Sequence, residues 1–193
     1  MSASRLLRDR RGIAALEFAI MAPVLLLLLL ATVDLVVWMR TWLRMEQATS
    51  EMTQIITQYS TLYNSDFTAT FLPVAQSAVG GVTLACSGGG MAVTGIDNSS
   101  GTPAVSWQWS SGACATSSFT TTSGPSTTLA MPGNYVPPSG YSAIVVELFT
   151  TQPAYVFSRK IMAATGLSNV HTYAVAIPRS GMLPTLTAGN RPS

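Results

Sequence analysis

An apolar run near the N-terminus constrains this chain more than any other feature. It extends from Ile13 to Val33, and Glu17 is its only charged residue. As an α-helix rising about 1.5 Å per residue, the run would be about 31 Å long, which matches the hydrocarbon thickness of a bilayer. We therefore predict one transmembrane helix, assigned to residues 13–38, with the lipid bilayer as a partner.

Arginines flank the run unequally and indicate its orientation. Four of them lie within the first twelve residues, whereas only Arg40 and Arg44 follow closely. Because positive charge is enriched on the cytoplasmic side of membrane proteins, we expect a cytoplasmic N-terminus and an exported C-terminal part. Trp38 and Trp42 are typical of the interfacial belt where such a helix leaves the lipid.

Two export signals share features with this segment. A cleaved secretory signal peptide also joins a basic start to an apolar stretch. The run is too long for a typical one, contains Glu17, and has no A-x-A-like site at residues 29–34. A twin-arginine signal at Arg10 and Arg11 is disfavoured because the pair leads directly into the Glu17 segment.

Glu17 needs an explanation because an unpaired carboxylate in a spanning helix costs about 2 to 4 kcal/mol. A cut after Gly12 would place a charged α-amine on Ile13, one helical turn from Glu17 of the same chain or beside that of a neighbouring subunit. The first helical turn also favours negative charge. The alternative is that Glu17 reaches the cytoplasmic headgroups without any processing. Asp34 is expected to be a solvated interface residue without a role.

The segment from Gly12 to Phe18, GIAALEF, resembles the type IV prepilin signature of a glycine, four mostly apolar residues, a glutamate and an aromatic residue. The Glu-Phe ending and the apolar helix behind it look most like the TadE-like pseudopilins of tight-adherence (Flp-type) pilus systems. The resemblance covers the N-terminal third well and the last third loosely, whereas residues 80–138 match no family pattern.

This resemblance implies that a prepilin peptidase removes the basic leader, residues 1–12, by cutting after Gly12. Ile13 would become the mature N-terminus, and Glu17 would pair with its amine. The protein would be a pseudopilin or minor pilin of the bacterial inner membrane that takes part in pilus assembly and cell adhesion. Its domain would be periplasmic or extracellular, and its partners would be other pilins or pseudopilins and pilus assembly proteins.

Beyond the span, apolar residues continue at helical spacing. They are Met45, Ala48, Met52, Ile55, Tyr59 and Leu62. The spacing predicts an amphipathic helical stem over residues 39–63. Its apolar face is expected to cover the sheet of its own chain, with the stems of other subunits as the alternative. The predicted fold is α+β, with a long N-terminal helix packed on a C-terminal antiparallel β domain.

Residues 64–178, rich in serine, threonine and glycine, are expected to form this exported domain, followed by a flexible tail at residues 179–193. Short strands are predicted at Gly81–Cys86, Met91–Ile96, Val105–Trp109, Tyr141–Phe149 and Val170–Ile177. Alternation along the last two is expected to bury one face. Cys86 and Cys114 are most simply a disulfide in an exported domain, worth about 3 to 4 kcal/mol. Two buried thiols are the alternative.

Groups suited to catalysis are few in the exported part. It has one histidine, His171, and three acidic residues after Ser65. No G-x-S-x-G, H-E-x-x-H or phosphate-binding glycine loop occurs. We expect no enzyme, no metal, no cofactor and no nucleic-acid binding. Two other functions remain open: an anchored surface module that binds glycan or protein through exposed Trp107, Trp109 and Ser/Thr loops, and an accessory pseudopilin of a secretion system.

Overall fold

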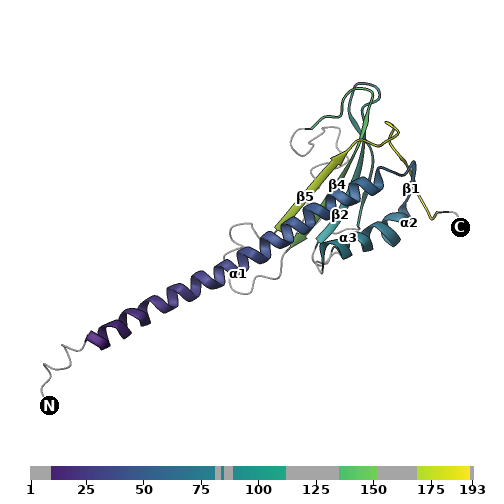
Figure 1. Ribbon diagram of the computed structural model, residues 1–193. Helices are drawn as coiled ribbons and strands as arrows, with labels where there is room; N and C mark the ends of the chain where they lie inside the picture. Colours follow the sequence, from purple (N-terminus) through teal and green to yellow (C-terminus); the bar gives the residue numbers. More distant parts are fainter. Residues whose placement is uncertain (1–9, 81–83, 85–88, 112–134, 152–168, 192–193) are drawn as a thin grey trace, which may run out of the picture.

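The computed structural model describes residues 10–80, 84, 89–111, 135–151 and 169–191 of the chain. Within these residues, one long helix leads into a mixed α+β domain, and its N-terminal half extends well away from that domain (Figure 1). The predicted fold class, a long N-terminal helix followed by an antiparallel sheet, is confirmed.

Helix α1 runs without interruption over Arg10–Ile56, 47 residues or about 70 Å. Pro23 lies inside it. Because proline has no N–H, the carbonyl of Ala19 loses its usual partner, a cost that neighbouring groups can offset in a membrane helix. The helix ends before the predicted stem end at Tyr63. Residues 57–60 form a turn instead, and the chain then continues as a short strand.

The sheet has four antiparallel strands in the order β3-β2-β4-β5. Their bounds are Gly89–Asp97 for β2, Ala104–Ser110 for β3, Ser142–Thr151 for β4 and Asn169–Ala176 for β5. Four of the five predicted strands are thereby confirmed. The first, Gly81–Cys86, lies outside the described residues apart from Leu84, which is buried.

Strand β4 is buried on both faces, whereas alternation along Tyr141–Phe149 predicted one buried face. Ile144, Val146 and Leu148 join the core beneath α1. Their neighbours on the opposite face, which include Val145 and Glu147, are buried as well. On this second face Val145 and Ile96 form a smaller cluster, against which Tyr135 packs, and burial on both faces accounts for the near-continuous apolar sequence of β4.

The core lies between the sheet and three helical segments that follow one another after α1. The segments are α2 (Asn64–Asp66), the π-helical turn η2 (Phe67–Phe71) and α3 (Leu72–Val79). Phe67 stacks on Trp109, with ring centroids 4.8 Å apart. Met45 and Met52 of α1 are fully buried in the same cluster. The stem therefore packs on the sheet of its own chain, as predicted.

The C-terminal segment differs from the predicted flexible tail. Strand β6 (Thr185–Thr187) pairs in parallel with β1 (Thr61–Tyr63), which follows α1 closely. Farther on, the guanidinium of Arg191 donates two hydrogen bonds to the Asp66 carboxylate, at 3.1 and 2.9 Å. These contacts hold the segment from Thr185 to Arg191 beside the end of the stem.

Candidate functional site: the N-terminal anchor and its junction with the domain

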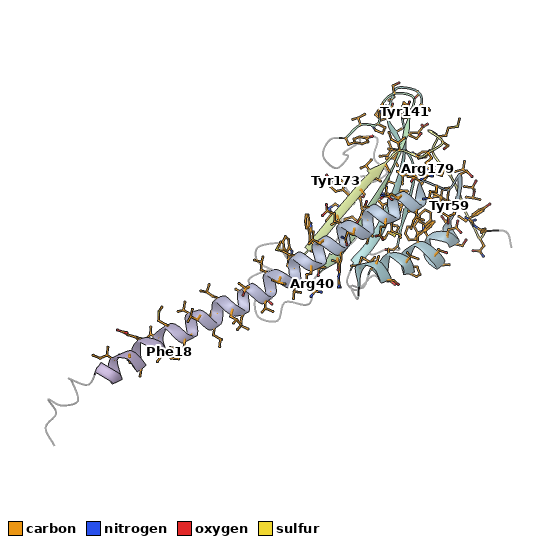
Figure 2. The ribbon with its side chains drawn as sticks, viewed as in Figure 1. Phe18, Arg40, Tyr59, Tyr141, Tyr173 and Arg179 are labelled. Atoms are coloured by element: carbon orange, nitrogen blue, oxygen red, sulfur yellow. The ribbon has the colours of Figure 1, made fainter. Side chains whose placement is uncertain are left out.

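The free half of α1 exposes its apolar side chains. Phe18, for example, is 69 % exposed and projects from the part of the helix that no other described element covers (Figure 2). A core helix of a soluble protein would bury such residues. By length and composition, α1 is able to cross a membrane, and it is the one helix in the described part of the chain that meets this criterion.

The predicted processing residues lie near the beginning of α1. The helix begins at Arg10, so the peptide bond after Gly12 lies within its first turn. Glu17 follows Ile13 by four residues, about 6 Å along the axis. Glu17 is exposed among apolar neighbours and forms no hydrogen bond or ion pair with any described residue. The anchor thus carries one unneutralised carboxylate close to the predicted cut.

Asp34 is not the solvated interface residue that the sequence suggested. It is 1 % exposed and takes part in an interaction. Because this carboxylate is shielded, the apolar surface of the helix continues past Asp34. Leu35 and Val36, which follow it, are exposed. If Glu17 lies at one membrane interface, the twenty residues from Phe18 to Val37 span about 30 Å, the full hydrocarbon thickness.

Trp38 and Trp42 lie at the junction where the exposed anchor becomes the packed stem. Their rings stack with centroids 6.5 Å apart and planes inclined by 10°. The indole N–H of Trp38 is buried and has no hydrogen-bond partner among the described groups. The stacking brings both indoles to one side of the helix, as a membrane interfacial anchor requires.

Arg40 and Arg44, the basic residues of the junction, differ in their surroundings. Arg40 is exposed on α1 (Figure 2). Arg44 lies against Gly80, where Nη1 is 2.6 Å from the position that a Cβ on this glycine would occupy. Gly80 ends α3 in the left-handed conformation, with φ of 69°. A cation there faces the C-terminal, negative end of the α3 dipole and helps to hold α3 on the stem.

Of the two tryptophans that the sequence offered for surface binding, Trp109 belongs to the core and Trp107 is partly buried against it. Trp109 is only 9 % exposed. Trp107 donates its indole N–H to the Pro184 carbonyl at 2.9 Å and packs beside Phe67. The anchored binding module therefore lacks the exposed indole of Trp109, and its Ser/Thr loops lie largely outside the described residues. Cys86 and Cys114 lie outside the described residues, so their disulfide stays a prediction.

Glu147 is a residue whose surroundings sequence reasoning missed. It is fully buried in the centre of β4, and His171 Nε2 lies 3.2 Å from its Oε1. The His171 ring also stacks on Phe149, with centroids 4.4 Å apart. The only signal in the sequence is one acidic residue inside the apolar strand YSAIVVELF. Among the described side chains, no group of three or more potential metal ligands occurs.

A comparison with protein-family models finds a match over the anchor and part of the stem. Residues 12–53 match the family model of TadE-like proteins. Over this segment the chain is similar to TadE-like proteins. The match begins at Gly12, includes Glu17, and ends at Thr53 on the part of α1 that contacts the sheet. No curated protein and no solved structure matches the chain.

The suspected resemblance is confirmed over the TadE-like segment. A TadE-like family match together with an apolar helix able to span a bilayer fits a pilus-associated membrane protein, anchored near its N-terminus. The four-stranded sheet lies outside the matched residues.

Proposed function

We propose that this TadE-like protein is a single-pass pseudopilin or minor pilin that takes part in assembling a tight-adherence pilus. It resides in the bacterial inner membrane with its N-terminus in the cytoplasm and its domain outside. The observation that carries the proposal is the family match, which begins at the predicted cleavage residue and continues along an exposed apolar helix.

Processing is the first step of this proposal. A prepilin peptidase cuts after Gly12, and the new α-amine of Ile13 lies one helical turn from Glu17. The support comes from Glu17, whose carboxylate has no partner in the described part of the chain although it sits on an apolar helix. Pairing with the amine, in the same subunit or in a neighbour, removes the cost of an isolated charge in lipid.

Assembly is the second step. Before assembly, the exposed apolar side chains of α1 are in lipid. In a filament or an assembly complex, the helices of other pilins would cover them instead. This role is structural and not enzymatic. His171, the one histidine, is engaged with Glu147 and stacked on Phe149, an environment that suits a structural residue.

The mature N-terminus tests the processing step. The protein is isolated from membranes of its native host and sequenced by Edman degradation or mass spectrometry, and we expect it to begin at Ile13. Gly12→Leu serves as the uncleaved control and should keep the leader. A wild-type protein that retains Met1 or Ser2 would instead be a plain membrane anchor for a surface domain.

Deletion of the gene tests the pilus role. We expect the strain to carry fewer pili by electron microscopy, and a plasmid copy of the wild-type gene should restore them. Normal pilus numbers with impaired export of a secreted protein would assign the chain to a secretion system. That result would leave the processing step intact.

A further inference from the structure

A small cleft lies between the stem and the edge strand β5, on the membrane side of the domain. Its volume is about 290 Å³, and it is lined by Trp42, Glu46, His171, Thr172 and Tyr173. Trp42 and Tyr173 are 38 % and 46 % exposed, so both rings are accessible from solvent or lipid. We propose that this cleft binds the ammonium headgroup of a phospholipid from the leaflet on the domain side of the membrane.

The chemistry of the lining favours an organic cation. Aromatic faces attract ammonium groups through their quadrupoles, and a nearby carboxylate adds direct charge attraction. The cleft combines Trp42 and Tyr173 with the carboxylate of Glu46, and its described lining contains no lysine or arginine. Glu46 forms no ion pair with any described residue, so its charge is available to a ligand.

His171 completes the lining as a fixed element. Its ring is held by the buried carboxylate of Glu147 on one edge and by stacking on Phe149. The hydroxyl of Thr172 is engaged with Thr49 of the stem. The walls of the cleft are thus tied to both α1 and the sheet, which keeps its shape without a ligand.

The position of the cleft near the proposed membrane surface favours a lipid headgroup as the source of the ammonium group. With the hydrocarbon layer ending near Val37, Trp42 lies about 7.5 Å beyond it along α1, and Glu46 about 13.5 Å. The headgroup layer on each side of a bilayer is about 5 to 8 Å thick. Helical side chains lean toward the helix N-terminus, which here brings the carboxylate of Glu46 back toward the lipid.

This inference rests on the proposed membrane anchoring, so the test uses protein that has already been recovered from the membrane fraction. The full chain is placed in nanodiscs of equal parts phosphatidylethanolamine and phosphatidylglycerol, then released in mild detergent and examined by native mass spectrometry. We expect wild-type protein to retain phosphatidylethanolamine preferentially. Trp42→Ala and Glu46→Gln should each lower this preference about three- to tenfold.

Matched controls separate the cleft from the rest of the stem. Glu51→Gln removes another exposed carboxylate of α1, and Leu43→Ala truncates another exposed apolar side chain, both outside the cleft. Both should keep the wild-type preference. Equal retention of the two lipids by membrane-inserted wild-type protein, or an equal loss in the controls, would overturn the inference while leaving the anchor intact.

A soluble headgroup distinguishes a lipid from a free amine as the ligand. Glycerophosphoethanolamine is titrated into the same nanodiscs before release. We expect no displacement of lipid at micromolar concentration, because the bilayer presents its headgroups at a far higher local concentration. Displacement at that concentration would assign the cleft to a soluble amine and overturn the lipid assignment.

Discussion

Thr49 of the stem and Thr172 of strand β5 share a buried hydrogen bond of 2.8 Å between their hydroxyl oxygens. Thr49 uses its own proton to donate to the Met45 carbonyl at 2.6 Å. The hydroxyl of Thr172 is therefore the donor of the shared bond. This bond connects the TadE-like segment directly to the edge of the sheet.

Replacing Thr49 should test that connection. Thr49→Val removes the acceptor and leaves the buried Thr172 hydroxyl unpaired, at a cost of about 1 to 3 kcal/mol. Thr172→Val should cost less, because Thr49 keeps its bond to Met45. The double variant should be more stable than the sum of the two losses predicts. Urea unfolding of the full chain in detergent, followed by tryptophan fluorescence, measures all three; strict additivity would argue against the shared bond.

Two methionines of the stem distinguish its packed face from its exposed face. Met52 is fully buried against the sheet, whereas Met39 is exposed. Met52→Ala should lower the free energy of unfolding by about 2 to 5 kcal/mol, because it leaves a cavity. Met39→Ala should change it by less than about 0.5 kcal/mol. The same unfolding assay measures both variants. Equal losses of stability in the two would contradict the intrachain packing of the stem.

A substitution at Gly95 in β2 tests the packing around Trp107. A Cβ at this position would overlap the indole of Trp107, which would have to move from its hydrogen bond to Pro184. Gly95→Ala should therefore cost about 1 to 3 kcal/mol and shift the tryptophan emission. Gly90→Ala is the control, because its Cβ would approach only the Ser111 hydroxyl, at 3.3 Å. Comparable losses in both variants would point to strand propensity alone.

The ion pair between Asp66 and Arg191 should make the stability of the fold depend on pH in the acidic range. Hydrogen bonds from Arg191 hold the pKa of Asp66 below its ordinary value of 3.8. The unfolded chain therefore takes up the proton first as the pH falls. This carboxylate contributes its full stabilisation at pH values above its ordinary pKa. The contribution is lost as the pH falls through the lowered pKa of the folded state.

Asp66→Asn should consequently lower the thermal midpoint at a pH of about 6 but have a smaller effect at a pH of about 2. Arg191→Met should show the same trend, because it removes the partner. Differential scanning fluorimetry of the full chain in detergent at both pH values is sufficient. A destabilisation that is identical at both would exclude the pKa shift as its cause.

Glu17→Ala addresses the proposed assembly role. The variant should insert into the membrane and be cleaved like the wild type, because alanine favours both helix and lipid. Incorporation into pili or assembly complexes should fall strongly, since the N-terminal amine loses its partner. Glu51→Ala provides a control on the same helix. Pilus counts in complemented deletion strains measure the effect, and normal piliation with Glu17→Ala would refute the pairing.

Features encoded by local sequence patterns were predictable. The apolar run from Ile13 has the length of a membrane-spanning helix, and the stripe that includes Met45 and Met52 has helical spacing. The strand at β4 was recognisable from its short run of β-branched and aromatic residues, but its burial on both faces was not. The family match over residues 12–53 belongs in this group too, because Gly12 and Glu17 lie close together in one segment.

Features that depend on distant parts of the chain were not predictable. Tyr59 and Leu62 continue the helical spacing, yet the chain turns after Ile56. There the Tyr59 ring packs edge-on against Phe71, and Leu62 enters a strand that pairs with the C-terminal segment. No local sequence pattern predicts a strand partner that lies more than a hundred residues away. The burial of Asp34 and Glu147 has the same origin, because a carboxylate becomes shielded only through its tertiary surroundings.

The unbroken course of α1 couples the angular orientation of the domain to the length of its anchor. An α-helix turns by about 100° per residue. One leucine more or fewer between Pro23 and Val33 would therefore swing the sheet by more than a quarter of a revolution about the helix axis, for an axial displacement of only about 1.5 Å. In an array of subunits with fixed anchors, the count of residues in that stretch would decide which side of each domain its neighbour meets.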